Sequence, residues 1–232
     1  MTVSSHPSKI IIALDGPAGS GKSTTARRVA QALGYVYIDT GAMYRAITLA
    51  ALREERSITN SDLLPVVQEY RLELVLTPEG QRTILGRDDV TQEIRSVEVT
   101  KMVSAVSALP SVREAMSKRQ REMGKHGGVV MDGRDIGTVV FPEAELKIFL
   151  VASLEERAKR RLAELHDTTL SLEEMCEQIQ ERDKQDTERL VSPLRKAPDA
   201  VEIDTSALSI EAQTERILAL AQERIAAKIT GK

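Results

Sequence analysis

The stretch Gly16-Pro17-Ala18-Gly19-Ser20-Gly21-Lys22-Ser23 lies between an apolar run, residues 10–14, and a helix-like segment, residues 23–33. It matches the pattern G-x-x-x-x-G-K-[ST]. The glycines of this pattern let successive backbone N–H groups face one centre, and the helix that follows adds the positive end of its dipole. A strand, a glycine-rich loop and a helix in this order therefore predict a cradle for a nucleoside triphosphate.

Two side chains of this loop are expected to act on the phosphates directly. Lys22 would bring a point charge to the outer phosphates, and the Ser23 hydroxyl would bind the Mg²⁺ that accompanies ATP. The predicted ATP-binding residues are the loop and the residue after it: Gly16, Pro17, Ala18, Gly19, Ser20, Gly21, Lys22, Ser23 and Thr24.

Composition limits the fold and the partners. The chain has 232 residues, 41% of them hydrophobic and only 3% aromatic, so aliphatic side chains must fill one sizeable core. A net charge of −3 argues against a nucleic-acid partner, and the single cysteine, Cys176, excludes an intramolecular disulfide. Residues 1–9 are polar and no apolar segment has the length of a membrane span. We therefore expect a cytoplasmic protein without a membrane partner.

Five short apolar runs punctuate the chain, at residues 10–14, 35–38, 129–131, 146–151 and 200–203. Helix-like segments separate most of them, which predicts an α/β fold with a five-stranded parallel sheet covered by helices. Ligands of such sheets bind beyond the carboxyl ends of the strands. Polar residues fall at four of these ends: Asp15, Asp39, Asp132 and Ser153.

Residues 63–96 interrupt this rhythm. Residues 71–76 and 82–85 alternate apolar and polar side chains around a turn signal at 77–80, and residues 88–90 are expected to add a third short strand. This pattern predicts a small antiparallel insertion. The core that carries the phosphate-binding loop at residues 16–23 (the P-loop) would then be discontinuous, comprising residues 1–62, 97–152 and 191–232.

The remaining segments are predicted to be helical. The helical patterns cover residues 97–123 with an interruption at Pro110, residues 153–165, 172–190 and 210–229. Ser153 is expected to cap the helix that begins there. Residues 153–190 would form a short helical lid and its adjoining helix.

Arginines at helical spacing favour a small-molecule phosphotransferase. Arg157 and Arg161 lie one turn apart on one helix, and Arg182, Asp186 and Arg189 share a face of another. Planar guanidinium groups hold phosphate by two hydrogen bonds and stay charged. The same spacing is typical of a solvated surface, so this evidence alone leaves both interpretations open.

Further motifs extend along nearly the whole chain. They are Asp39-Thr40-Gly41-Ala42-Met43-Tyr44-Arg45, Pro110-Ser111-Val112-Arg113-Glu114, Asp132-Gly133-Arg134-Asp135-Ile136-Gly137-Thr138-Val139-Val140-Phe141-Pro142, Lys147-Ile148-Phe149-Leu150, the run from 153 to 161, and Glu181-Arg182-Asp183. In this order, together with the loop at 16–23, they resemble the bacterial cytidylate kinases of the nucleoside monophosphate kinase group. The run from 132 to 142 is far more specific than the P-loop, and the insertion at 63–96 resembles an extra piece of the family's monophosphate-binding domain.

The resemblance implies an acceptor site. Arg45 and Arg134 would clamp the phosphate of the acceptor, and Ser104, Arg113 and Asp135 would line the cytosine. A carboxylate at Asp135 suits cytosine because cytosine presents an amino donor where uracil presents an acceptor oxygen. The alternative role for Asp135 is a helix N-cap after the strand.

The resemblance also implies contacts to the sugar and to the transferring phosphoryl group. Arg182 and Asp186 would face the sugar hydroxyls with Arg189 nearby, and Arg157 and Arg161 would close over the phosphoryl group as lid arginines. Thr40 belongs to the acceptor site at a position where the family often has Ser, so the hydroxyl is kept. Asp132 would hold Mg²⁺ through water or shape the Asp-Gly turn, and Asp39 is expected to cap a helix.

These expectations define one reaction, ATP + CMP (or dCMP) ⇌ ADP + CDP (or dCDP), by direct in-line transfer with Mg²⁺. The residues expected to be catalytic are Lys22, Arg134, Arg157 and Arg161. The family also implies a monomer. Two alternatives stay open: a kinase of the same fold for UMP, AMP or a small metabolite, and a nucleotide-dependent switch. A guanine-reading switch motif is not expected, because the similar run Asp183-Lys184-Gln185-Asp186 lies in a charged helical stretch.

Overall fold

A parallel sheet forms the core of the computed structural model, which describes residues 9–77, 80–165 and 169–230. Five strands pair in the order β2-β6-β1-β7-β8. Their bounds are β1 (Ile11–Asp15), β2 (Val36–Asp39), β6 (Val129–Gly133), β7 (Leu146–Val151) and β8 (Val201–Asp204). All four pairings are parallel, so the predicted α/β fold is confirmed.

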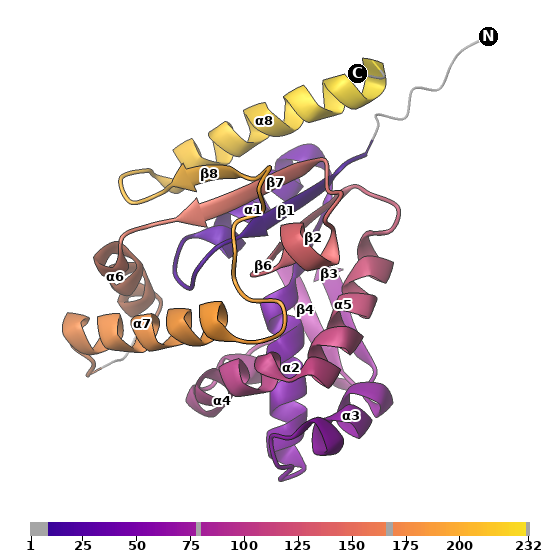
Figure 1. The fold of residues 1–232 in the computed structure, drawn as a ribbon, viewed down its shortest axis with the longest axis vertical. Coiled ribbons are helices and arrows are strands. Elements are labelled where there is room, and N and C mark those ends of the chain that lie inside the picture. The colour runs from indigo at the N-terminus through magenta and orange to yellow at the C-terminus, as the bar shows by residue number, and fades with distance from the viewer. Residues whose placement is uncertain (1–8, 78–79, 166–168, 231–232) are drawn as a thin grey trace.

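Helices surround this sheet. They are α1 (Lys22–Leu33), α2 (Thr40–Arg53), α3 (Asn60–Glu69), α4 (Val97–Ala108), α5 (Pro110–Gly124), α6 (Leu154–Glu164), α7 (Leu172–Glu188) and α8 (Ile210–Thr230). Figure 1 shows α8 lying across the upper side of the sheet, α2 to α5 below it, and α6 and α7 projecting to the left. None of the helices in the described ranges is long and apolar enough to cross a membrane.

The alternation of side chains along β1 divides the core between the two faces of the sheet. Ile12 and Leu14 pack with Val29 of α1 and Ile217 of α8 on one face. Ala13, between them, points to the other face and joins a separate buried cluster. Strands buried on both faces explain why the sequence shows continuous apolar runs instead of alternating ones.

Polar caps define where several helices begin. Asp39 accepts a hydrogen bond from the Ala42 N–H at 2.9 Å and starts α2, as predicted. Ser153 accepts from the Glu156 N–H and starts α6, also as predicted. Pro110 occupies the first turn of α5, where its missing N–H costs nothing, so it separates α4 from α5. The predicted break between α6 and α7 includes residues 166–168, which lie outside the described residues.

A second, antiparallel sheet has the strand order β3-β4-β5. It consists of β3 (Leu72–Thr77), β4 (Gly80–Leu85) and β5 (Asp88–Asp89), so the expected third short strand is present. Residues 78 and 79 of the predicted turn lie outside the described residues. The sequence-based boundary at residue 63 falls inside α3, because Thr59 caps that helix and its apolar side chains join the neighbouring core.

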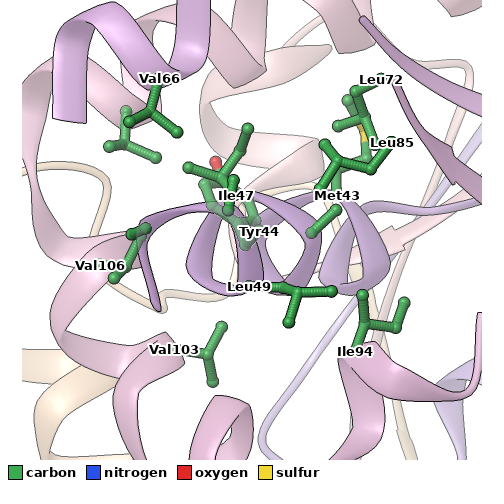
Figure 2. Packing of buried hydrophobic residues seen from close by; sticks show 14 of the residues in the cluster. Met43, Tyr44, Ile47, Leu49, Val66, Leu72, Leu85, Ile94, Val103 and Val106 are labelled. Carbon is green, nitrogen blue, oxygen red and sulfur yellow. The ribbon is translucent and has the colours of Figure 1, made fainter. Parts of the chain in front are cut away.

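The small sheet is fastened to α2 by apolar packing. Leu72 and Leu85 belong to the same buried cluster as Met43 and Ile47 of α2. Figure 2 shows Leu72 and Leu85 beside Met43, with Val103 and Val106 of α4 around the same helix. Helix α2 therefore links the insertion to the end of β2, where it begins.

Candidate active site

A cavity of about 440 Å³ opens at the carboxyl ends of the strands. The P-loop forms one wall, and residues of α2, α5, α7 and the segment after β6 form the others. Most of the predicted site residues line it: Ala18, Gly19, Ser20, Gly21, Lys22, Ser23, Thr24, Thr40, Arg45, Arg113, Asp132, Arg134, Asp135, Arg161, Arg182, Asp186 and Arg189. The structure thus brings together residues that lie up to 171 positions apart in the sequence, from Ala18 to Arg189.

The P-loop depends on a glycine at its first position. Gly16 has φ +150°, and a Cβ atom there would lie 2.2 Å from the carbonyl oxygen of Leu150. No other residue fits so close to β7 without moving the backbone. Gly16 and Pro17 are not among the cavity-lining residues, so the structure gives these two predicted ATP-binding residues a role in shaping the loop.

Lys22 is folded back onto its own loop. Its Nζ donates to the Pro17 carbonyl at 2.6 Å and lies 3.2 Å from the Ser20 hydroxyl. Burial, together with the charge of nearby Arg134, lowers the pKa of Lys22 well below its usual value. An anion bound in the loop would offset this loss of hydration.

Ser23 and Asp132 meet at the floor of the cavity. The Ser23 hydroxyl donates to Oδ2 of Asp132 at 2.7 Å, and the Tyr37 hydroxyl donates to Oδ1 at 3.0 Å. Burial, with the negative charge of Asp39, raises the pKa of Asp132 to about 6. A hydroxyl and a buried carboxylate beside the phosphate loop are hard oxygen donors, which fit Mg²⁺.

Arg113 and Asp135 form a buried ion pair at the far end of the cavity. Nη2 of Arg113 lies 2.6 Å from Oδ2 of Asp135, and Nη1 donates to the Ser107 carbonyl at 3.0 Å. The guanidinium lies 5.2 Å from the centre of the Tyr44 ring. Asp135 precedes the π-helical turn η2 (Ile136–Val140), yet its side chain makes no capping hydrogen bond. The helix-cap alternative for this residue is therefore excluded.

Alternating charges continue from this pair toward the P-loop. Arg189 lies 3.9 Å from Oδ1 of Asp135 and 3.5 Å from Asp186, which in turn accepts from Nε of Arg134 at 2.8 Å. Burial opposes the ionisation of Asp186, but Arg134 and Arg182 hold its pKa below the usual value. The pairing holds Arg134 in the cavity wall, where its charge acts on Lys22.

Two further arginines carry positive charge that no carboxylate neutralises at contact distance in the described ranges. Burial and the charges of Arg182 and Arg161 lower the pKa of Arg45 to about 9. Burial and the charge of Arg134 lower the pKa of Arg182 to about 10, and its Nε is buried without a hydrogen-bond partner in the described residues. Cations held this close together in a dry pocket are stabilised when an anion binds between them.

The chain also matches known proteins over most of its length. A model of the cytidylate kinase family, described as "Cytidylate kinase", matches residues 12–223. The chain belongs to the cytidylate kinase family. The cytidylate kinase of Anoxybacillus flavithermus is 54% identical to it over 220 residues, which cover 94% of this chain and 98% of that protein. The cytidylate kinase of Bacillus subtilis is 51% identical over 219 residues, which cover 93% and 98%.

Solved structures support the fold alone. An uncharacterized protein from Eubacterium ventriosum superposes with a TM-score of 0.50 at 12% identity and covers 92% of this chain and 99% of that one. At 12% identity this likeness supports the fold and carries no information about the substrate.

The two predicted lid arginines take different positions in this member of the cytidylate kinase family. Arg161 lines the cavity and pairs with Glu164 at 2.8 Å. Arg157 is buried instead, donating to Asp183 at 2.5 Å and to the Ala18 carbonyl at 3.2 Å. It lies behind the P-loop, so the structure does not bring it to the cavity.

Ser104 is also displaced from the main cavity. It lines a neighbouring cavity of about 500 Å³ between α4 and α7, which shares Arg161 and Arg182 with the first. Thr40 does line the main cavity, and its hydroxyl donates to the backbone carbonyl of Asp132 at 2.7 Å. Thr40 therefore fastens the start of α2 to β6.

Asp15 lies at the end of a strand, as predicted, and its role in the site was not predicted from the sequence. Its carboxylate accepts from the backbone N–H groups of Ile136 and Gly137 at 2.9 and 2.7 Å, and so holds the segment that follows Asp135. Burial, together with the charge of Asp135, raises the pKa of Asp15 to about 7. The aromatic neighbours Tyr37 and Tyr44 were missed as well, because a tyrosine in a strand or helix reads as ordinary core.

Proposed function

We propose that this protein transfers the γ-phosphoryl group of ATP to CMP or dCMP and so forms CDP or dCDP for pyrimidine nucleotide metabolism. The observation that carries the proposal is the pairing of two anion sites across one cavity. Lys22 and the P-loop form the donor site, while Arg45, Arg134 and Arg182 form the acceptor site. A switch that only hydrolyses its nucleotide has no use for the second site.

The base preference rests on Arg113 and Asp135. Arg113 holds one oxygen of the Asp135 carboxylate, and the other oxygen lies beyond hydrogen-bond distance of Arg189. That second oxygen would accept a hydrogen bond from the amino group of cytosine. Uracil would present an acceptor oxygen to the same carboxylate, which disfavours UMP.

The transfer needs positioning and charge stabilisation rather than a protein base, because the attacking phosphate oxygen is already anionic. Arg45 and Arg134 hold the acceptor phosphate in line with the donor, and Lys22 and Arg161 offset the charge that develops on the transferring group. Arg182, Asp186 and Arg189 line the acceptor side, where Arg182 and Asp186 meet the sugar hydroxyls. Arg157 supports the P-loop from behind in this conformation, and its reach to the phosphoryl group would require closure of the lid.

Mg²⁺ would enter with ATP. Ser23 would bind it and Asp132 would hold it through water, and the ion would neutralise part of the phosphate charge. The chain would act as a monomer in the cytoplasm, with no nucleic-acid or membrane partner.

An assay of ADP release separates the proposal from its alternatives. The acceptors to compare are CMP, dCMP, UMP, AMP and none. Stimulation by CMP and dCMP well above UMP and AMP is the expected result. Stimulation by UMP or AMP alone would refute the base assignment, and slow release that ignores every acceptor would favour a switch.

A further inference from the structure

The edge strand β2 directs alternate backbone N–H groups away from the parallel sheet. β2 is an edge strand and pairs only with β6 within the described sheet. The Val36 N–H donates to the Gly128 carbonyl on the β6 side. Since N–H groups alternate in direction along a strand, the N–H of Asp39, three residues later, points to the free edge.

The insertion supplies the acceptor for this N–H. Oε1 of Gln81, on β4, accepts from the Asp39 N–H at 3.0 Å, across 42 residues of sequence. The amide nitrogen of Gln81 is buried and makes no hydrogen bond in the described residues. Arg95, near the end of the insertion, lies 3.6 Å from Oδ2 of Asp39. The insertion therefore holds Asp39 by its backbone and by its side chain.

Asp39 in turn sets the acceptor wall of the cavity. Its Oδ1 caps α2 through the Ala42 N–H. The next residue, Thr40, ties the start of α2 to β6, and Arg45 follows on the same helix within the cavity wall. A shift of Asp39 would move the first turn of α2 and with it the acceptor arginine.

We propose that Gln81 is a positioning residue that fixes the acceptor side of the site and thereby gives the β insertion a role in binding the monophosphate. The expected effect on KM for CMP rests on the proposed function. The structural consequence, ordering of residues 39–45, stands independently of any substrate.

The test uses Gln81→Met, which keeps the length of the side chain and removes the hydrogen-bond acceptor. KM for CMP should rise roughly fivefold, the equivalent of about 1 kcal/mol for one hydrogen bond, while KM for ATP and kcat stay near wild type. Gln92→Met is the matched control, because Gln92 is an exposed glutamine just after the same sheet, and it should leave every constant unchanged. An equal rise for both substrates, or no rise, would overturn the inference.

Hydrogen exchange of the substrate-free protein provides the second measurement. Peptides that cover residues 37–45 should exchange faster in Gln81→Met than in wild type, whereas peptides of α8 should not change. Unaltered exchange at 37–45 would overturn the inference even if CMP were not the substrate. Failure of the wild type to phosphorylate CMP, with faster exchange in the variant, would refute the proposed function and leave the positioning role supported.

Discussion

Arg113 and Asp135 face each other at 2.6 Å with both side chains almost inaccessible to solvent. A buried ion pair gains little net stability, since the cost of removing two charges from water offsets their attraction. The pair fixes the direction of the carboxylate: Arg113 holds Oδ2, while Oδ1 lies 3.9 Å from Arg189. Under the proposed function, a carboxylate held in this way would prefer the amino group of cytosine to the acceptor oxygen of uracil.

Replacing Asp135 by Asn should weaken discrimination between CMP and UMP. The amide can offer either an acceptor or a donor to the base, so the preference for CMP is expected to fall by a factor of about 10 to 100, corresponding to about 1–3 kcal/mol. The ratio of kcat/KM for the two acceptors measures it. An unchanged ratio would remove Asp135 from base recognition. The Tm should also fall, because Arg113 loses its buried partner.

Replacing Lys22 by Ala should lower kcat at least about a hundredfold without lowering stability. The loss reflects missing charge stabilisation, about 3 kcal/mol or more, while the desolvated ammonium contributes little to the folded state. Lys147→Met is the matched control: Lys147 is a buried lysine that donates to the Pro142 carbonyl and pairs with Asp199. It should retain kcat. A Lys22→Ala enzyme with normal turnover would contradict the P-loop role.

Replacing Arg45 by Met should stabilise the ligand-free protein while removing its response to anions. The variant removes the cost of burying the guanidinium and its repulsion with Arg182 and Arg161, but it also loses hydrogen bonds to Thr100 and to the Ile94 carbonyl. We therefore expect a Tm gain of no more than roughly 2–4 °C, about 1 kcal/mol for a chain of this size. Inorganic phosphate should raise the Tm of wild type more than that of the variant.

Arg119→Met is the control for this experiment, since Arg119 donates to the Val67 and Tyr70 carbonyls away from the cavity. It should lose stability and keep the full response to phosphate. A Tm decrease in Arg45→Met together with an undiminished phosphate response would contradict the assigned role of Arg45.

The pKa of Asp15 predicts a pH dependence of stability. Burial raises the pKa to about 7 from an ordinary 3.8, so between these values the folded protein keeps a proton that the unfolded chain releases. The contribution of Asp15 to the free energy of unfolding is largest below about pH 4. It falls as the pH rises to 7, by at most on the order of 4 kcal/mol.

Urea unfolding of Asp15→Asn at pH 5 and pH 8 isolates the effect. The variant should gain stability relative to wild type as the pH rises, because Asn has no proton to release. Asp204→Asn serves as control: hydrogen bonds from Ser206 lower the pKa of exposed Asp204, so its difference from wild type should be the same at both pH values. A constant difference for Asp15→Asn would contradict the raised pKa.

Local features of the sequence were sufficient for much of the fold and part of the site. Glycines at 16, 19 and 21 and the apolar runs act within a few residues, so the P-loop and all five core strands were predictable. Arg157 and Arg161 show the limit. They lie one turn apart on α6. Arg157 is nevertheless buried behind the P-loop, where it pairs with Asp183, whereas Arg161 lines the cavity. Which partner an arginine meets depends on how α6 packs on α7.

The contact between Gln81 and Asp39 shows the same limit for the insertion. An alternating strand pattern indicates which face of the hairpin is buried, but it does not indicate which distant backbone N–H a glutamine will meet. The helical nature of residues 63–69 was missed for a related reason, since the Thr59 cap and the apolar spacing of α3 were read together with the hairpin that follows.

Phosphorus NMR of a mixture of ATP, CMP, Mg²⁺ and the protein tests the central claim most directly, because it identifies the product of transfer. The account predicts that the resonances of CDP and ADP grow together and that inorganic phosphate stays at the level seen without enzyme. Growth of inorganic phosphate with ADP, and no CDP, would contradict it.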